Sequence, residues 1–241
     1  MKILITTDWY APSVNGVVTS VLNLKEKLEE QGHQVRVLTL AQNKGESWRQ
    51  QGRREGNVWY LPSVGAGRIY PGARVVWGAG RRFVREMIAW KPDVVHSQCE
   101  FTTFWFAAKI AKAAGAPLLH TYHTVYEDYT HYFSPNRAFG KKAAAVFSRL
   151  VLGRVDGVIV PTDKVKRLLE GYGVRQPIWT VPSGIDCARF REARRERKER
   201  PAGASLRLLF LGRLAREKNL EELLIWMARR SIRKYKPEAV E

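Results

Sequence analysis

Short apolar runs alternate along the chain with segments whose apolar residues recur every three or four positions. The first run, residues 3–6, predicts a buried strand. A helix with Val17, Val21 and Leu24 on one face follows, and Gly32 closes it. The further predicted strands are residues 35–38, 58–61, 93–96, 117–121, 157–160 and 178–181. The further predicted helices are residues 74–90, 101–114, 139–152 and 162–170, and residues 41–56 and 122–138 are predicted loops.

This strand–helix alternation predicts an α/β fold with a doubly wound parallel sheet. Ligands of such sheets bind beyond the carboxyl ends of the strands. Three polar segments follow predicted strands: residues 8–16, 96–100 and 120–131. We therefore expect these segments to converge on one edge of the sheet, with Asp8 among the residues that line a cleft there.

The amino-acid composition of the chain changes after residue 187. Residues 188–204 are highly charged, have no apolar face and are interpreted as a linker. A new apolar run at 206–211 predicts a strand, and residues 217–226 predict a helix. The sequence thus predicts a first domain at 1–187, a linker at 188–204 and the start of a second Rossmann-like domain at 205–241.

The strong positive charge indicates an anionic partner. The 241 residues include 41 Lys and Arg against 23 Asp and Glu, a net charge of +18. Nucleic acid, phosphorylated small molecules and an anionic membrane surface all fit such a charge. No zinc-finger, RRM or helix-turn-helix signature accompanies it, so we do not expect nucleic-acid binding. The sequence gives no indication of the oligomeric state.

The expected location is the cytoplasm, with any membrane contact peripheral and on the cytoplasmic face. No apolar stretch approaches the roughly twenty residues that a spanning helix needs. Cys99 and Cys187 lie far apart, without metal or redox spacing, and fit a reducing compartment.

A glycine-bearing turn, residues 12–18, joins the first predicted strand to the first helix. Gly16 would let backbone N–H groups at the helix N-terminus approach a phosphate. The alternative is that Gly16 only makes a tight turn, because the segment lacks the repeated glycines of a dinucleotide fingerprint.

Residues 120–132 form the most polar segment beside a predicted strand. They include three His, four Tyr and two acidic residues, which would each need a partner if buried. A sugar or polar head group suits them better than zinc, because the His spacing matches no familiar ligand pattern. A polar surface loop remains the alternative. The candidate cleft residues here are Tyr122, His123, Tyr126, Glu127 and Asp128.

Residues 210–219 carry a second candidate phosphate site. Arg213 and Lys218 bracket a turn that leads into a predicted helix, where they could bind a pyrophosphate. The alternative is a solvated helix start, with Glu217 placed favourably near the helix dipole.

Three motifs occur in the order and rough spacing of a known enzyme family. They are Pro12–Val17, Val181–Asp186 followed by Arg189-Phe190, and Gly212–Asn219. In this series the chain resembles the family-four glycosyltransferases of the GT-B fold. Residues 120–132 are in addition similar to those of bacterial enzymes that transfer glucose from UDP-glucose to diacylglycerol at the cytoplasmic membrane face.

The resemblance implies roles for the matching positions. Gly16 would place its backbone beside the donor diphosphate, and His123 would face the transferring sugar. Arg213 and Lys218 would neutralise the diphosphate leaving group, so that no metal or other cofactor is expected. The implied partners are a nucleotide-sugar donor and a lipid acceptor or anionic membrane surface.

The chain also departs from the family pattern. The family's second domain carries two glutamates spaced eight apart, which should lie well beyond Lys218. Residues 225–237 do not continue the pattern, so we expect a truncation or frame shift after about Leu224 and negligible turnover. The alternatives are an inactive fragment that acts as a binding module and a transferase with a non-lipid acceptor.

The segment Arg68–Trp90 combines basic and aromatic residues and could dock on anionic lipid. The alternative is a core-packed amphipathic helix with a solvated basic face.

Overall fold

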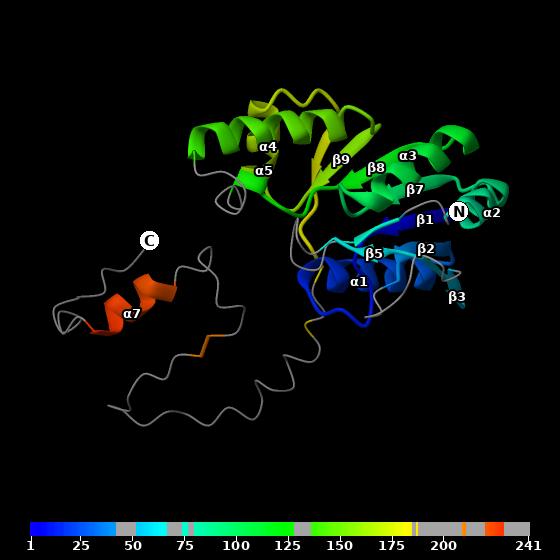
Figure 1. Cartoon of the computed structure of the whole chain (residues 1–241), viewed down its shortest axis with the longest axis horizontal. Helices are drawn as coiled ribbons and strands as arrows, with labels where there is room; N and C mark the ends of the chain where they lie inside the picture. Colours follow the sequence, from blue (N-terminus) through cyan, green and yellow to red (C-terminus); the bar gives the residue numbers. More distant parts are fainter. Residues whose placement is uncertain are drawn as a thin grey trace. The chain divides into compact units, whose positions relative to one another are not determined.

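The computed structural model divides the chain into two units, Met1–Asp186 and Cys187–Glu241 (Figure 1). The residues that it describes are 1–41, 52–66, 74–76, 80–127, 136–184, 187, 209–210 and 220–228. In the second unit the described regular element is helix α7 (Leu220–Ala228).

The first unit is built on an eight-stranded sheet in the order β10-β9-β8-β7-β1-β2-β4-β3. All neighbouring strands in it pair in parallel except β3, which is antiparallel to β4. The strands are β1 (Lys2–Thr7), β2 (Gln34–Leu40), β3 (Arg53–Glu55), β4 (Val58–Leu61), β7 (Val94–Ser97), β8 (Leu118–Thr121), β9 (Gly157–Val160) and β10 (Ile178–Thr180). A separate antiparallel pair joins β5 (Val64–Gly65) to β6 (Arg74–Val75).

The strand order reverses beside β1. The chain runs outward from β1 through β2 to β4, then returns to place β7 on the other side of β1 and continues outward through β8, β9 and β10. A reversal of this kind opens a crevice beyond the carboxyl ends of the two central strands. The fold therefore directs a ligand to the loops that follow β1 and β7.

Among the described residues of this unit, five helices connect the strands: α1 (Gly16–Glu30), α2 (Arg81–Trp90), α3 (Thr102–Ala114), α4 (Arg137–Leu152) and α5 (Asp163–Gly171). Three of them begin at polar residues whose side chains accept backbone hydrogen bonds, as N-caps do. Asn15 accepts from Val18, Asn136 from Ala138 and Phe139, and Thr162 from Val165.

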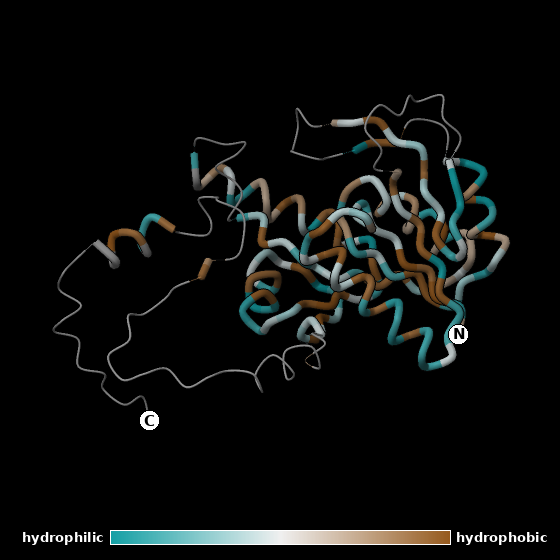
Figure 2. Tube along the Cα trace, turned by 90° about the horizontal axis from the view of Figure 1, so that it is seen from below, coloured by the Kyte–Doolittle hydropathy of each residue, from teal (hydrophilic) through white to brown (hydrophobic). Residues whose placement is uncertain are grey.

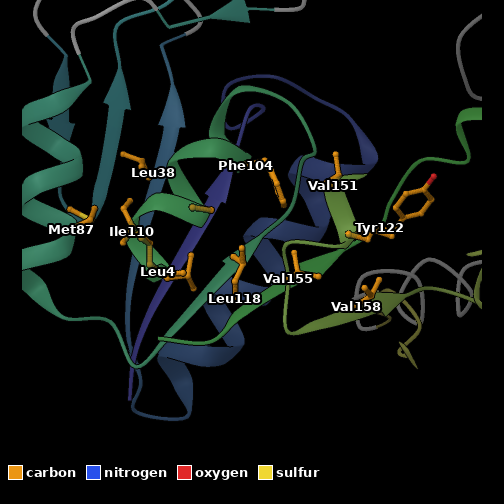
Figure 3. Packing of buried hydrophobic residues seen from close by; sticks show 14 of the residues in the cluster. Leu4, Leu38, Met87, Phe104, Ile110, Leu118, Tyr122, Val151, Val155 and Val158 are labelled. Carbon is orange, nitrogen blue, oxygen red and sulfur yellow. The ribbon is translucent and has the colours of Figure 1, made fainter. Parts of the chain in front are cut away.

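Successive residues of β1 point to opposite faces of the sheet and enter two separate hydrophobic clusters. Leu4 packs in a large cluster with residues of α2 and α3 such as Met87 and Phe104 (Figure 3). Ile5 lies in the second cluster, with Val21 of α1. Figure 2 shows these hydrophobic strands in the interior of the unit. Helices thus cover both faces, and the predicted doubly wound α/β fold is confirmed.

The predicted strands and most predicted helices of the first domain agree with the structure to within two residues. The predicted helix at 74–90 is wrong at its start, because residues 74–75 form β6 and the described helix begins at Arg81. The Arg74 guanidinium donates to Oγ and the carbonyl oxygen of Ser63, both at 2.7 Å. These tertiary contacts hold Arg74 beside Ser63, the residue before β5.

The strand β3 was missed within the predicted loop 41–56. It is a short, exposed edge strand of sequence Arg-Arg-Glu, so it has no apolar residues to give a strand pattern. Its arginines instead lie over aromatic rings of β4: Arg53 over Tyr60 and Arg54 over Trp59, each 4.4 Å from the ring centroid.

The predicted linker 188–204 lies outside the described residues. Of the predicted strand at 206–211 only Leu209 and Phe210 are described, and they have no regular secondary structure. The predicted helix at 217–226 overlaps α7. In the described part of the chain, no helix is both long and apolar enough to cross a membrane.

Candidate functional site

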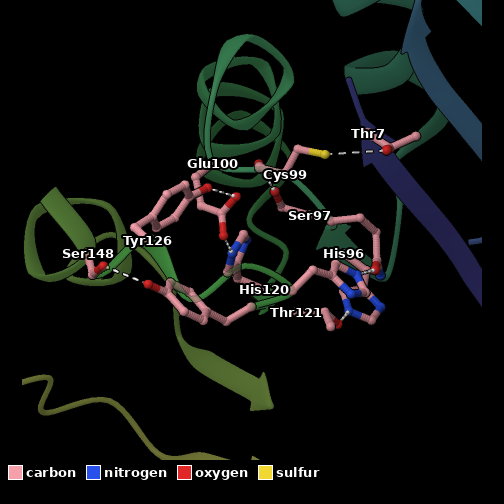
Figure 4. A network of polar contacts seen from close by, with 12 residues as sticks. Thr7, His96, Ser97, Cys99, Glu100, His120, Thr121, Tyr126 and Ser148 are labelled. Atoms are coloured by element: carbon pink, nitrogen blue, oxygen red, sulfur yellow. Dashed lines mark hydrogen bonds and ion pairs between the residues drawn. The ribbon is translucent and has the colours of Figure 1, made fainter. Parts of the chain in front are cut away.

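Three loops meet beyond the carboxyl ends of β1, β7 and β8, and hydrogen bonds join them (Figure 4). Asp8 follows β1 and binds the start of α3. Gln98 and Glu100 follow β7 and bind residues of the β8 segment. The predicted convergence of the three polar segments on one sheet edge is therefore confirmed.

Asp8 holds the N-terminus of α3. Its carboxylate accepts from the backbone N–H groups of Thr102 at 3.0 Å and Thr103 at 2.7 Å, and from the Thr103 hydroxyl at 2.5 Å. Burial raises the pKa of Asp8, and the hydrogen bonds from Thr103 and Thr102 oppose that shift. A carboxylate at a helix N-terminus is also favoured by the helix dipole. This contact positions α3, and a contact of Asp8 with a sugar stays a prediction.

His123, the predicted catalytic residue, is half-buried after β8. Its Nε2 lies 2.7 Å from Oε1 of the buried Gln98. Burial lowers the pKa of His123 to about 4, with the neighbouring His120 acting in the same direction and Glu100 in the opposite one. The imidazole is therefore neutral at pH 7 and can accept or donate a hydrogen bond without carrying charge.

Glu100 joins two residues of the polar segment. Its Oε2 accepts from the Tyr126 hydroxyl at 2.7 Å, and its Oε1 lies 3.3 Å from Nε2 of the fully buried His120. Burial and Glu100 together raise the pKa of Tyr126 well above its ordinary value. The sequence predicted that residues 96–100 reach this edge, but neither Gln98 nor Glu100 was named as a candidate site residue; their place after a predicted strand was the available signal.

Tyr122 lies in the core and does not line an open cleft as predicted. Its side chain is 1% exposed, and its hydroxyl is 2.9 Å from Oγ of Ser148 in α4. Burial raises its pKa. The strand alternation explains this placement, because Tyr122 shares a face with the buried His120 while His123 points to the other side.

Glu127 and Gly16 are the two other predicted site residues that the structure describes. Glu127 is half-buried and pairs with Lys141 of α4 at 3.0 Å. Gly16 is the first residue of α1, and nothing lies within 4 Å of where its Cβ would be. Its φ lies outside the left-handed region, so the turn itself does not require glycine. The open space is compatible with a close approach of phosphate.

The remaining predicted site residues, Asp128, Arg213 and Lys218, lie outside the described residues. Within the described ranges, no group of three or more His, Cys, Asp and Glu is arranged to hold a metal ion. His120 and His123 instead have separate polar partners, Glu100 and Gln98.

A doubly wound parallel sheet with helices on both faces defines a Rossmann-like domain, and this fold matches that of GT-B glycosyltransferases. Residues 14–189 match glycosyltransferase family 4, and the chain belongs to that family.

The relatives of the chain agree with this assignment. It is 32% identical over 239 residues, 95% of its length, to an alpha-monoglucosyldiacylglycerol synthase of Streptococcus pneumoniae strain ATCC BAA-255 / R6, and covers 52% of that protein. It is 34% identical to the synthase of the same name from Acholeplasma laidlawii over 79% of the chain and 48% of the relative. The chain thus spans about half the length of these relatives.

The chain is more distantly similar to proteins that are named for other sugars. A GDP-mannose-dependent alpha-mannosyltransferase of Mycolicibacterium smegmatis is 25% identical over 95% of the chain and 60% of its own length. Among solved structures, sucrose-phosphate synthase from Thermosynechococcus elongatus matches with a TM-score of 0.59 at 18% identity, over 94% of the chain and 59% of that structure. This last likeness concerns the fold.

Proposed function

We propose that the chain forms the acceptor-side part of a retaining hexosyltransferase that moves glucose from UDP-glucose to diacylglycerol. The observation that carries this proposal is the polar cluster around His123 beyond the carboxyl ends of β7 and β8 in a family 4 domain. The names of the two relatives at 32% and 34% identity support glucose as the sugar and diacylglycerol as the acceptor.

In the proposed reaction the bond between the anomeric carbon of glucose and the β-phosphate oxygen of UDP breaks. A bond forms from that carbon to the hydroxyl oxygen of diacylglycerol, and the hydroxyl proton leaves with the departing diphosphate. The neutral His123 would hold a hydroxyl of the transferring sugar. The N–H groups at the start of α1, beside Gly16, would face the diphosphate.

Arg213 and Lys218 would neutralise the charge that develops on the leaving diphosphate. With these two cations in that role, the proposed mechanism requires no metal or other cofactor. Tyr126 and Glu127 would belong to the wall of the sugar or acceptor cleft, together with Asp128.

We also propose that an anionic membrane surface on the cytoplasmic side presents the acceptor. The helix α2 supports this in one respect, because Arg81, Arg82 and Arg85 are exposed. Its apolar residues Phe83 and Met87 are buried in the core cluster, so they are not available for insertion into lipid. The contact with the membrane would therefore be electrostatic at this helix.

The test is a transfer assay with the 241-residue chain and mixed micelles that contain diacylglycerol and an anionic phospholipid. Labelled UDP-glucose should yield labelled glucosyl-diacylglycerol, and labelled GDP-mannose should not. Such transfer by this chain would contradict the truncation and negligible turnover expected from the sequence. His123→Ala should lower the rate on the order of tenfold to a hundredfold, because a buried-site hydrogen bond to the sugar is lost. His33→Ala, in the turn before β2, is the matched control and should leave the rate unchanged.

A direct measurement of diacylglycerol binding accompanies the assay. Saturable binding without transfer would favour the alternative of a binding module. Mannose transfer would overturn the proposed donor, and the absence of both transfer and binding would overturn the proposal as a whole.

A further inference from the structure

The contact between Gln98 and His123 has a chemical consequence for the imidazole ring. A neutral histidine carries its proton on only one of its two nitrogens, and the hydrogen bond made by one nitrogen decides which. Nε2 of His123 lies 2.7 Å from the amide oxygen of Gln98. An amide oxygen only accepts hydrogen bonds, so Nε2 must be the protonated nitrogen.

The backbone of Gln98 is held in place, and its side-chain Oε1 faces the ring while its Nε2 is buried without a hydrogen-bond partner among the described residues. Gln98 is 2% exposed and directly follows β7, whose backbone is fixed between β1 and β8. The backbone N–H of Gln98 donates to the carbonyl oxygen of Thr6 in β1 at 2.8 Å. Burial lowers the pKa of His123, and the ring is therefore neutral when the contact forms at pH 7.

The other nitrogen of His123 is left for a ligand. The ring is half-buried, and its Nδ1 is not one of the buried unpartnered polar atoms of the described residues, whereas Nδ1 of His120 is. With Nε2 protonated, Nδ1 presents a lone pair. A group that binds there must be a hydrogen-bond donor, such as a sugar hydroxyl.

We propose that Gln98 is a positioning residue that fixes His123 in the Nε2-protonated tautomer, so that Nδ1 accepts a hydrogen bond from a hydroxyl of the bound hexose. The part that concerns the hexose rests on the proposed function; the tautomer does not. Among the residues that the structure describes, the other ionisable groups near the ring are Glu100, His120 and His96, and none of them is hydrogen-bonded to His123.

The tautomer is measured by long-range proton–nitrogen NMR correlations of the ¹⁵N-labelled chain at pH 7. Wild type should show His123 with a protonated Nε2 and an unprotonated Nδ1. Gln98→Leu removes the acceptor at similar volume and should shift the tautomer ratio toward Nδ1–H by about two- to tenfold, the effect of one hydrogen bond. Gln98→Glu keeps an acceptor and should restore the Nε2–H form while raising the pKa of His123.

The signals of His33, in the turn before β2, serve as the internal control and should be unchanged in each variant. A wild-type His123 protonated on Nδ1, or a tautomer ratio that is identical in wild type and Gln98→Leu, would overturn the proposal. If Gln98→Leu does not fold, the wild-type spectrum and Gln98→Glu decide the question.

The transfer assay then separates this proposal from the proposed function. Gln98→Leu should slow transfer and Gln98→Glu should restore part of the rate. The expected tautomer in a chain without transferase activity would confirm the role of Gln98 and overturn the proposed reaction.

Discussion

The carboxylate of Asp8 accepts two hydrogen bonds from Thr103, which lies 95 residues further along the chain. One comes from the backbone N–H and one from the hydroxyl, and a third bond comes from the N–H of Thr102. A residue directly after β1 thus acts as the cap of α3, whose N-cap residue Phe101 makes no side-chain hydrogen bond to the helix. The contact links the end of β1 to the start of α3, the helix that follows β7, where the strand order reverses.

Asp8→Ala should lower the free energy of unfolding by about 1–3 kcal/mol, because the buried donors at the start of α3 lose their acceptor. Urea unfolding followed by circular dichroism measures this change. Glu30→Ala is the control, since it removes only the exposed Lys27–Glu30 ion pair and should cost less than about 1 kcal/mol. Equal effects of the two substitutions would contradict the capping role.

The Tyr122–Ser148 contact should have a measurable coupling energy. The two hydroxyl oxygens are 2.9 Å apart and buried between the end of β8 and α4. A double-mutant cycle with Tyr122→Phe, Ser148→Ala and the double variant should give about 0.5–1.5 kcal/mol of coupling in the unfolding free energy. A coupling of zero would mean that this hydrogen bond does not join the two elements.

His96 should make the fold sensitive to acid. Burial lowers its pKa from 6.5 to about 3, so the unfolded chain takes up this proton below about pH 6.5 and the folded chain does not. Stability contributed by the neutral histidine is therefore lost as the pH falls from about 6.5 toward 3, by up to about 1.4 kcal/mol per pH unit.

His96→Gln should reduce this slope by about one proton between pH 6 and pH 4, as measured by urea unfolding at each pH. Above pH 7 the variant and wild type should differ only by a constant offset. Parallel curves across the whole acidic range would show that His96 titrates normally in the folded state.

Two glycines should respond differently to an added methyl group. A Cβ on Gly52 would lie 2.3 Å from a ring carbon of Phe83 and 2.7 Å from the carbonyl oxygen of Tyr60, whereas nothing lies within 4 Å at Gly65. Gly52→Ala should cost about 1–3 kcal/mol, because the backbone oxygen cannot move aside cheaply. Gly65→Ala should be close to neutral, and thermal unfolding of the two variants compares them directly.

The exposed arginines of α2 should carry part of any membrane contact. A triple variant with Ser at Arg81, Arg82 and Arg85 should sediment much less with anionic vesicles. The binding free energy should weaken by about 1 kcal/mol per charge removed at low salt. Neutral phosphatidylcholine vesicles provide the control. Unchanged binding of the triple variant to anionic vesicles would remove α2 from the interface.

The sequence by itself determined the fold class, the parallel strands of the first domain and the edge where the polar segments meet. Each parallel strand is an apolar run, and strand order in a βαβ series places successive carboxyl ends together. The burial of Ile3, Leu4 and Ile5 and the gathering of Gln98, Glu100 and His123 at one edge follow from these local patterns.

The tertiary structure alone decided which polar residues face one another. Hydrophobic periodicity reports which side of an element is buried, but it does not report the partner of a buried hydroxyl or carboxylate. That partner depends on packing across long sequence separations, as for Asp8 with Thr103 and Tyr122 with Ser148. The same holds for residues 74–75, which form β6 and not the start of the predicted helix. The contact between Arg74 and Ser63 is a tertiary one that helix periodicity does not report.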